Sequence, residues 1–340
     1  MSQRIIFHIG ASKCGSSALQ TELSKGRDLL SPDGRRDAYA VFDSVEGVCF
    51  GSELKARLNR YARGYIPSPD LKEIKTFDDE WYAKTRKKLA TALADHDGLI
   101  FSSEGWFNVG LGFRDIAFFE RLGIQVEVIA YIRPQVQFMN SAWWQWGAWT
   151  GKSLDEYIEY RLPSIRWDRF IDRWKQVPGV SQVKVKLLGK DVVSDFFEHA
   201  GIVFNRDSQD KVNKGLPSEI LRLYQRHRDL RASPSASVMD FVLSRHLGLS
   251  GETPWVITPQ HADHIIRECS ESNRKLDRHL DRESLKALQS DPGWWDAGCY
   301  RDKAVAPWQP IPATDEKMDR LCAEMARAIL RLDKKLRLSC

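Results

Sequence analysis

The sequence predicts an α/β protein in which a parallel central sheet is flanked by helices and followed by a helical C-terminal layer. Two observations favour this class. Short apolar runs alternate with segments of helical periodicity as far as residue 204, whereas strand signals disappear from residue 205 onward. The length of 340 residues is enough to bury a large core, and we interpret residues 1–340 as a single domain.

The first predicted unit is a strand, a glycine loop and a helix. Residues 4–9 form a short isoleucine-rich run that ends at Gly10, and apolar residues at helical spacing begin near Ser16. Between them, residues 10–17 read GASKCGSS. Because the N-terminus of a helix offers free backbone N–H groups, such a loop suits an anion, and a phosphate in particular.

Three further strands are predicted at Gly98–Ser102, Val126–Ile132 and residues 183–188, alternating with helical segments. Asp191 can cap the helix that follows the last of them, and Gly201 can end that helix. Strands that alternate with helices indicate parallel pairing.

The remaining segments complete the predicted organisation. Helical periodicity recurs in residues 216–230, 238–247 and 315–336, so residues 206–340 are predicted to form the helical C-terminal part. Residues 26–75 mix basic and aromatic residues with glycine and proline. We interpret this segment as an irregular insertion near the site.

The composition excludes several classes of function. The net charge is only +5 and no basic block stands out, so nucleic acid is not a predicted partner. We expect no membrane span, because no apolar run approaches the ~20 residues needed, and the chain start lacks a signal-peptide layout. The six scattered cysteines are typical of reduced thiols and a cytoplasmic location. His261 and His264 have a spacing seen at metal sites, but nothing completes a ligand set, and we predict no bound metal.

The glycine loop differs from a triphosphate-binding loop. That pattern reads Gly-x-x-x-x-Gly-Lys-Ser/Thr, whereas here Ser16 follows Gly15 and Lys13 lies two residues before it. The lysine is therefore not in the position from which it would bind a γ-phosphate. A tight glycine turn without a ligand would account for the glycines alone equally well.

A second anion ligand is predicted where the strand Val126–Ile132 ends. Arg133 comes next, and Pro134 suits the first turn of a following helix. Ser141 would then lie in the third turn, so that Arg133 and Ser141 can face one pocket. A guanidinium fork matches phosphate oxygens, and a surface salt bridge is the alternative role for this arginine.

Together these residues resemble the two phosphate-binding signatures of sulfotransferases that use 3′-phosphoadenosine 5′-phosphosulfate (PAPS). Residues 8–20, HIGASKCGSSALQ, carry the first signature, and Tyr131-Ile132-Arg133 with Ser141 carries the second. The pair in this order is specific, whereas each alone is weak. Patchy similarity extends to about residue 280, where residues 272–276 resemble a C-terminal motif of bacterial members.

The resemblance implies a five-stranded parallel sheet like that of nucleotide kinases, and PAPS as the co-substrate. It implies that the 3′-phosphate binds Arg133 and Ser141. The 5′-phosphosulfate would lie over the loop residues Lys13, Cys14, Gly15, Ser16 and Ser17.

Two departures from the family pattern concern these ligands. The threonine that usually follows the loop lysine is Cys14 here. The Arg-Lys-Gly motif that clamps the 3′-phosphate in animal cytosolic members is absent, and Arg274 is the candidate substitute.

Sulfuryl transfer to a hydroxyl needs a cation near the bridging oxygen and a base for the acceptor's proton. Lys13 is the natural cation. Glu104 follows the strand Gly98–Ser102 and should therefore lie at the same edge of the sheet as the loop. Animal cytosolic members carry their catalytic histidine at a comparable strand end, whereas the positions of His8 and His96 suit structural or exposed roles. Glu104 is therefore the predicted base, with capping or an ion pair as its alternative role.

The predicted activity is transfer of a sulfuryl group from PAPS to a hydroxyl on a small molecule or glycan, without metal. A small-molecule kinase and a nucleotide-binding protein without catalysis are the alternatives. Cys14, beside a lysine and a helix N-terminus, could also be a thiolate nucleophile. A phosphatase-type Cys-x5-Arg loop, however, would need arginine where the chain has Gln20.

Four tryptophans follow Arg133 closely, at positions 143, 144, 146 and 149. They cover much of the circumference of the predicted helix. They are interpreted either as an aromatic wall for an acceptor ring or as packing against the C-terminal helices.

Overall fold

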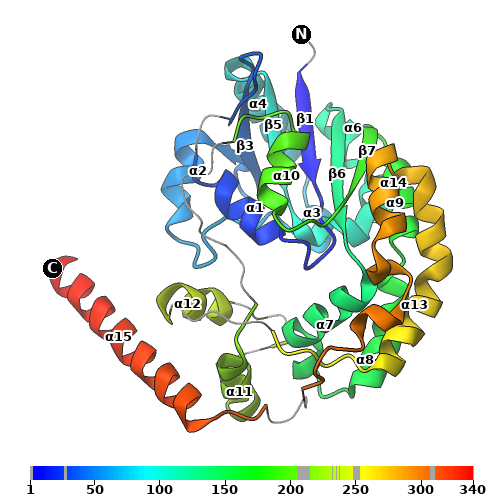
Figure 1. The fold of residues 1–340 in the computed structure, drawn as a ribbon. Helices are drawn as coiled ribbons and strands as arrows, with labels where there is room; N and C mark the ends of the chain where they lie inside the picture. The colour runs from blue at the N-terminus through cyan, green and yellow to red at the C-terminus, as the bar shows by residue number, and fades with distance from the viewer. Residues whose placement is uncertain are drawn as a thin grey trace.

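The computed structural model describes residues 3–26, 29–204, 215–231, 233–234, 236, 238–247, 253–306 and 311–339. In these residues one sheet has the order β2-β3-β5-β1-β6-β7, and β4 pairs with β3 (Figure 1). The strands are β1 (Arg4–His8), β2 (Leu29–Leu30), β3 (Arg36–Asp43), β4 (Gly47–Phe50), β5 (Gly98–Ser102), β6 (Val126–Ile132) and β7 (Val180–Leu187). Strands β3, β5, β1, β6 and β7 pair in parallel, and β2 and β4 are antiparallel to β3. The predicted α/β class is confirmed.

Helices surround this sheet, with α1 and α10 in front of it and α4 and α6 behind it in Figure 1. The helices are α1 (Ser16–Leu23), α2 (Gly51–Leu58), α3 (Leu71–Ile74), α4 (Asp79–Asp95), α5 (Gly110–Asp115), α6 (Phe118–Leu122), α7 (Gln135–Gln145), α8 (Leu154–Arg161), α9 (Trp167–Lys175), α10 (Val192–His199), α11 (Ser218–Arg226), α12 (Val238–Leu247), α13 (Pro259–Arg274), α14 (Arg282–Ser290) and α15 (Asp315–Ser339). None of the helices in the described ranges is both long and apolar enough to cross a membrane.

The predicted elements coincide closely with the observed ones. Strands β5 and β6 and helix α12 have the predicted bounds, while β7 begins earlier, at Val180. The carboxylate of Asp191 accepts the backbone N–H groups of Val193 and Ser194 at 3.2 and 3.3 Å, which caps α10. Gly201 ends that helix with a φ of 65°, in the left-handed region. Within residues 206–340, the regular elements of the described part are all helices.

The prediction that residues 26–75 are irregular was wrong. This segment contains β2, β4, α2 and α3, and its strand β3 lies inside the sheet, parallel to β5. The strand reads RDAYAVFD, and its buried centre contains Tyr39, Val41 and Phe42, residue types that favour strands. The apolar run is short and has charged residues at both ends. It therefore does not stand out from the rest of the segment, whose composition is basic and contains several glycines.

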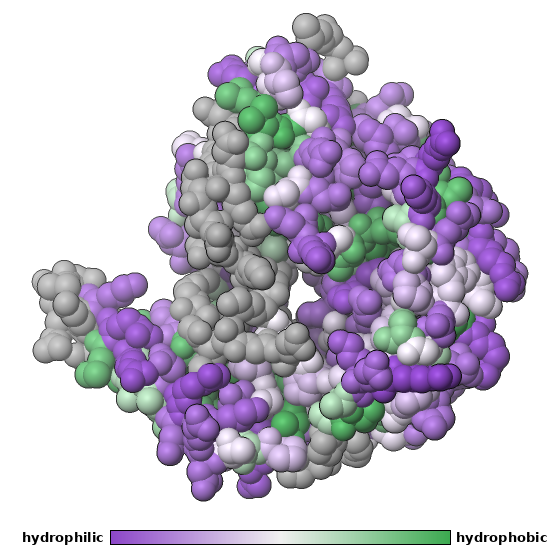
Figure 2. Space-filling model, in the orientation of Figure 1, coloured by the Kyte–Doolittle hydropathy of each residue, from purple (hydrophilic) through white to green (hydrophobic). Residues whose placement is uncertain are grey.

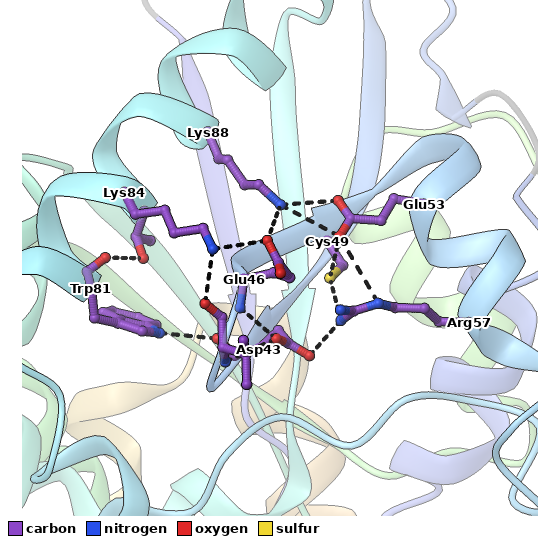
Figure 3. A network of polar contacts seen from close by, with 10 residues as sticks. Asp43, Glu46, Cys49, Glu53, Arg57, Trp81, Lys84 and Lys88 are labelled. Carbon is purple, nitrogen blue, oxygen red and sulfur yellow. Dashed lines mark hydrogen bonds and ion pairs between the residues drawn. The ribbon is translucent and has the colours of Figure 1, made fainter.

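A polar network attaches the β3–β4 hairpin to α2 and α4 (Figure 3). Asp43 is its centre: the carboxylate accepts Nη1 of Arg57 at 2.6 Å, and the backbone carbonyl accepts Nε1 of Trp81 at 3.0 Å. The ammonium of Lys88 bridges the carboxylates of Glu46 and Glu53 at 3.4 and 3.1 Å. The hairpin thus anchors the edge of the sheet through charged hydrogen bonds as well as apolar packing.

We expect Asp43→Ala to lower the free energy of unfolding by about 2–3 kcal/mol, because it leaves the guanidinium of Arg57 and backbone N–H groups without their charged acceptor. Urea unfolding followed by far-ultraviolet circular dichroism measures this difference. Asp79→Ala is the matched control: it removes an ion pair of 2.8 Å to Arg121 from a fully exposed side chain. That control should change stability by less than about 1 kcal/mol, and equal effects of the two substitutions would contradict the prediction.

The apolar core covers both faces of the sheet. At its centre Phe101 stacks on Phe7 and Phe42, with ring centroids 5.0 and 4.5 Å apart. A smaller cluster joins α11, α12 and α15 through Ile220, Tyr224, Leu247, Leu321 and Ala328, and we call it the C-terminal cluster.

Candidate functional site

The residues predicted to carry the chemistry follow three adjacent strands. Strand β1 lies between β5 and β6, with His8 opposite both Ser102 and Ile129. The glycine loop follows β1, Glu104 follows β5, and Arg133 follows β6. Because the carboxyl ends of parallel strands meet at one edge, the three groups share that edge. A hollow lies near the middle of the molecule, between the part that carries the sheet and α7 (Figure 2).

The loop between β1 and α1 is shaped by two residues in the left-handed region. Lys13 has a φ of 67° and Gly15 a φ of 79°. A β-carbon on Gly15 would lie 2.6 Å from Cγ1 of Val192, so a larger residue does not fit there. Gly15 is the N-cap of α1 and provides no side-chain cap. The first N–H groups of α1 therefore have no partner within the helix and are oriented to bind an anion.

The two serines of the loop have different environments. The hydroxyl of Ser17 lies 3.3 Å from the Tyr65 hydroxyl. The hydroxyl of Ser16 is buried without a hydrogen-bond partner, and it would lie 2.6 Å from a β-carbon at Gly10. Through its side chain Ser17 is the more accessible of the two, while both contribute backbone N–H groups at the start of α1.

Arg133 touches the loop directly. Its Nη1 donates to the backbone carbonyl of Lys13 at 2.9 Å, and its Nη2 donates to Oε1 of Gln137 at 3.2 Å. Nε1 of Trp167 donates to the Arg133 carbonyl at 2.9 Å and fixes the backbone at this strand end. The predicted proximity of Arg133 and the glycine loop is therefore present in the structure.

Helix α7 presents one partly exposed stripe. Gln137, Ser141 and Gln145 are half-buried, whereas the other residues of this helix are buried. Their spacing of four residues places them on one face, in line with Arg133 one turn earlier. Arg133 precedes the helix and bonds to Gln137 of this stripe, while Ser141 lies one turn further along it.

Lys13 and Glu104 influence each other's ionisation. Burial lowers the pKa of the Lys13 ammonium, and the Arg133 charge lowers it further, while the carboxylates of Glu104 and Asp240 oppose this shift. Burial raises the pKa of Glu104, opposed by the Lys13 charge and by hydrogen bonds from the Lys13 backbone and the Ser12 side chain. A carboxylate with a raised pKa beside a desolvated cation is an arrangement suited to proton transfer.

The structure brings residues to the loop that the sequence interpretation missed. Arg63 and Tyr65 come from the 26–75 segment: Tyr65 contacts Ser17, and the charge of Arg63 acts on Glu104. Asp240 of α12 acts on Lys13, and the neighbouring Phe241 packs edge-on against Tyr65 at 6.2 Å. The basic and aromatic composition of 26–75 indicated the first pair, but nothing in the sequence connected α12 with the loop.

Cys14 does not fit the predicted ligand set. Its side chain is fully buried in the core, and its backbone N–H donates to the Ala11 carbonyl at 3.1 Å. Neither group is free to contact a nucleotide. Burial raises the pKa of the thiol to about 12, so it is protonated at neutral pH. The interpretations of Cys14 as a nucleotide ligand and as a nucleophile are both corrected: it packs beneath the loop.

Arg274 lies at the end of α13, where it is exposed. Its neighbours in the motif are buried: Ser272 donates to Asp168, and Asn273 exchanges hydrogen bonds of 2.6 and 3.3 Å with Gln135 at the start of α7. Among the described contacts, Arg274 makes none with the loop or Arg133. The motif at 272–276 therefore attaches α13 to α7 and α9, and it does not bring the predicted arginine to the site.

The four tryptophans divide between packing and partial exposure. Trp143 and Trp144 are buried, the first against Tyr157 and the second donating to the Pro254 carbonyl at 2.7 Å. Trp146 and Trp149 are half-buried and lie beneath the guanidinium groups of Arg161 and Arg231. Packing thus accounts for the first pair, and only the second pair can contribute an aromatic surface to a ligand.

The two histidines of α13 join helices. His261 contacts Asp155 at 2.7 Å and His264 contacts Glu159 at 2.6 Å, which ties α13 to α8. Across the ranges that the structure describes, no three His, Cys, Asp or Glu side chains are grouped to hold a metal ion.

The solved structures that resemble this chain include two of low similarity. A sulfotransferase from Alicyclobacillus acidocaldarius has 16% identity and a TM-score of 0.39, covering 85% of this chain and all of that one. A ParA family ATPase from Chlorobium tepidum TLS has 12% identity and a TM-score of 0.25, covering 70% of this chain and 91% of that one. No protein-family model and no curated protein matches the sequence. At such scores neither similarity assigns an activity to this chain.

Proposed function

We propose that the protein is a sulfotransferase that moves a sulfuryl group from PAPS to a hydroxyl acceptor in the cytoplasm. The observation that carries the proposal is the position of the loop, Glu104 and Arg133 at the ends of three adjacent strands, with Arg133 bonded to the Lys13 carbonyl. An anion-binding loop, a second cation and a half-buried carboxylate at one sheet edge are groups that suit sulfuryl transfer.

Each group has a defined role in this proposal. The first N–H groups of α1 and the Ser17 hydroxyl bind the 5′-phosphosulfate. The Lys13 ammonium stabilises the charge that develops on the leaving phosphate. Glu104 accepts the proton of the acceptor hydroxyl as its oxygen attacks sulfur, the S–O bond to the phosphate breaks, and adenosine 3′,5′-bisphosphate leaves. Arg133 and Ser141 hold the 3′-phosphate from the α7 face.

The acceptor side is less defined than the donor side. The proposed acceptor is a small molecule or glycan that bears a hydroxyl and lies beside Glu104. Trp146 and Trp149, which are half-buried, can provide an aromatic surface for its ring. Arg274 has no role in the proposal, because it is exposed at the far end of α13.

Incubation with PAPS and a panel of sugars, glycans and phenols, followed by mass spectrometry, tests the activity itself. The proposal predicts an acceptor that gains one sulfuryl group, together with release of adenosine 3′,5′-bisphosphate. Transfer of a phosphoryl group from ATP to the same acceptors, without reaction of PAPS, would instead establish a kinase.

We expect this turnover to persist in EDTA. The sulfuryl group carries less negative charge than a γ-phosphoryl group, and Lys13 precedes Gly15 instead of following it. The initial rate with PAPS should therefore change by less than about twofold on chelation. A complete loss of activity that Mg²⁺ restores would contradict the prediction.

A further inference from the structure

Two buried polar groups lie beneath the anion-binding loop without a hydrogen-bond partner. They are Nε2 of His8, at the end of β1, and Oγ of Ser16, the first residue of α1, and neither has a partner among the described residues. The two residues are only 0% and 1% exposed, so water does not satisfy them either. Buried polar groups in folded proteins are nearly always paired. The roles proposed above for the loop use the backbone of Ser16 and leave both side-chain groups unexplained.

The two groups lie beside the same point of the chain. A β-carbon on Gly10 would be 2.6 Å from Oγ of Ser16 and 3.2 Å from Nε2 of His8, and glycine leaves that point free. Burial lowers the pKa of His8 to about 3, so the ring is neutral at pH 7. A neutral imidazole has one donor and one acceptor nitrogen, and a hydroxyl can donate or accept. The two groups are therefore able to satisfy each other.

The imidazole of His8 is held in place from its other side. Its Nδ1 lies 2.8 Å from Oγ of Ser102, the last residue of β5. Tyr131 of β6 and Phe196 of α10 pack against the ring, with centroids 5.6 and 5.5 Å away. The ring is therefore fixed, whereas the side chain of Ser16 can change its direction by rotation about one bond.

We propose that His8 is a positioning residue of the anion-binding loop: when the first N–H groups of α1 bind an anion, the Ser16 hydroxyl forms a hydrogen bond with Nε2 of His8. The inference rests on the proposed function, in which that anion is the 5′-phosphosulfate of the donor. The bond exists only with the anion bound, so it adds to the affinity for that anion. It also completes a chain from Ser102, two positions before Glu104, to the start of α1. The strand end that carries the base is thereby connected to the loop that carries the donor.

Substitution of Gly10 tests this geometry without removing either group. Gly10→Ala places a methyl group between Nε2 of His8 and the Ser16 hydroxyl, and the backbone at Gly10 lies outside the left-handed region, so alanine causes no strain there. It should weaken the binding of adenosine 3′,5′-bisphosphate and of ADP by roughly 3- to 10-fold, the typical net contribution of one hydrogen bond. Gly189→Ala is the control, because a β-carbon there meets none of the described atoms within 4 Å, and it should leave both affinities unchanged.

A double-mutant cycle measures the interaction between the two side chains. Ser16→Ala removes the hydroxyl, and His8→Asn keeps a polar group near Ser102 but removes Nε2. Each substitution should weaken binding of both nucleotides by roughly 3- to 10-fold, and the double variant should bind no more weakly than either single one. In the parent labelled with ¹⁵N-histidine, the Nε2 resonance of His8 should shift on saturation with nucleotide while that of Nδ1 stays in place. A merely structural histidine would not show this selective shift.

The use of two nucleotides separates this inference from the proposed function. Coupled effects with ADP, together with no binding of the 3′,5′-bisphosphate, would support the role of His8 and reject the sulfotransferase. Binding of the bisphosphate with independent, multiplying effects of the two substitutions would overturn the role of His8 alone, and so would ring resonances of His8 that do not change at saturation. If neither nucleotide binds, the loop is not an anion site and both proposals are wrong.

Discussion

Glu104→Gln is expected to lower the single-turnover rate of sulfuryl transfer by 10²–10⁴-fold, the typical cost of losing a general base. Glutamine keeps the shape of the side chain but cannot accept the acceptor's proton. Donor affinity should change little, because the loop N–H groups and Arg133 are untouched. Rapid-quench measurement of sulfated product at saturating PAPS gives the rate, and calorimetric titration with adenosine 3′,5′-bisphosphate gives the affinity.

The pH dependence of the same reaction provides an independent readout. Burial raises the pKa of Glu104, so protonation removes the base at a pH above the usual range of a glutamate. The parent rate should therefore rise with pH through that pKa, and this acidic limb should be absent in Glu104→Gln. Glu120→Gln, on an exposed position of α6, is the control. A Glu104→Gln enzyme that retains the parent rate and pH profile would make Glu104 structural.

Lys13→Ala should weaken both binding and turnover, because the same ammonium contacts the bound donor and the transition state. Loss of a hydrogen bond to a charged group costs about 1.5–3 kcal/mol, which corresponds to roughly 10- to 150-fold in donor affinity. The turnover rate should fall by a further 10²–10³-fold, since stabilisation of the developing charge is lost as well.

Lys190→Ala is the control for this prediction. Lys190 is exposed and lies between β7 and α10, after the carboxyl end of a strand of the same sheet. The Lys190→Ala substitution removes one positive charge from the same edge of the sheet and leaves the loop unchanged. If Lys13→Ala and Lys190→Ala reduced turnover equally, the effect would come from the general positive potential of this edge, and Lys13 would have no specific role.

The sheet was predictable because its strands carry strong local signals. β5 and β6 are largely apolar runs, and each is followed by polar or charged residues, so their bounds follow from the sequence alone. β3 was missed because its apolar centre is short and lies in a long segment of basic and glycine-rich composition. The identity of Arg133 as a neighbour of the loop also followed from the sequence, since adjacent parallel strands end at one edge.

Other parts of the site depend on long-range packing, which no local pattern encodes. Asp240 acts on Lys13 although 227 positions separate them, because α12 packs where Phe241 meets Tyr65. Cys14 was mistaken for a ligand because its neighbours in sequence face the edge of the sheet, whereas the turn at Lys13 directs the thiol into the core. Arg274 was chosen by motif position, but Asn273 beside it carries the contact to α7.

The most direct test of the central claim is the relative affinity for adenosine 3′,5′-bisphosphate and ADP, which carry two phosphates each and differ in where the second is attached. Titration calorimetry of the parent should give at least about tenfold tighter binding of the 3′,5′-bisphosphate, because Arg133 and Ser141 are proposed to hold the 3′-phosphate. Arg133→Ala should remove most of this preference and leave ADP binding nearly unchanged. Equal affinity of the parent for the two nucleotides, or tighter binding of ADP, would contradict the assignment of the site to PAPS.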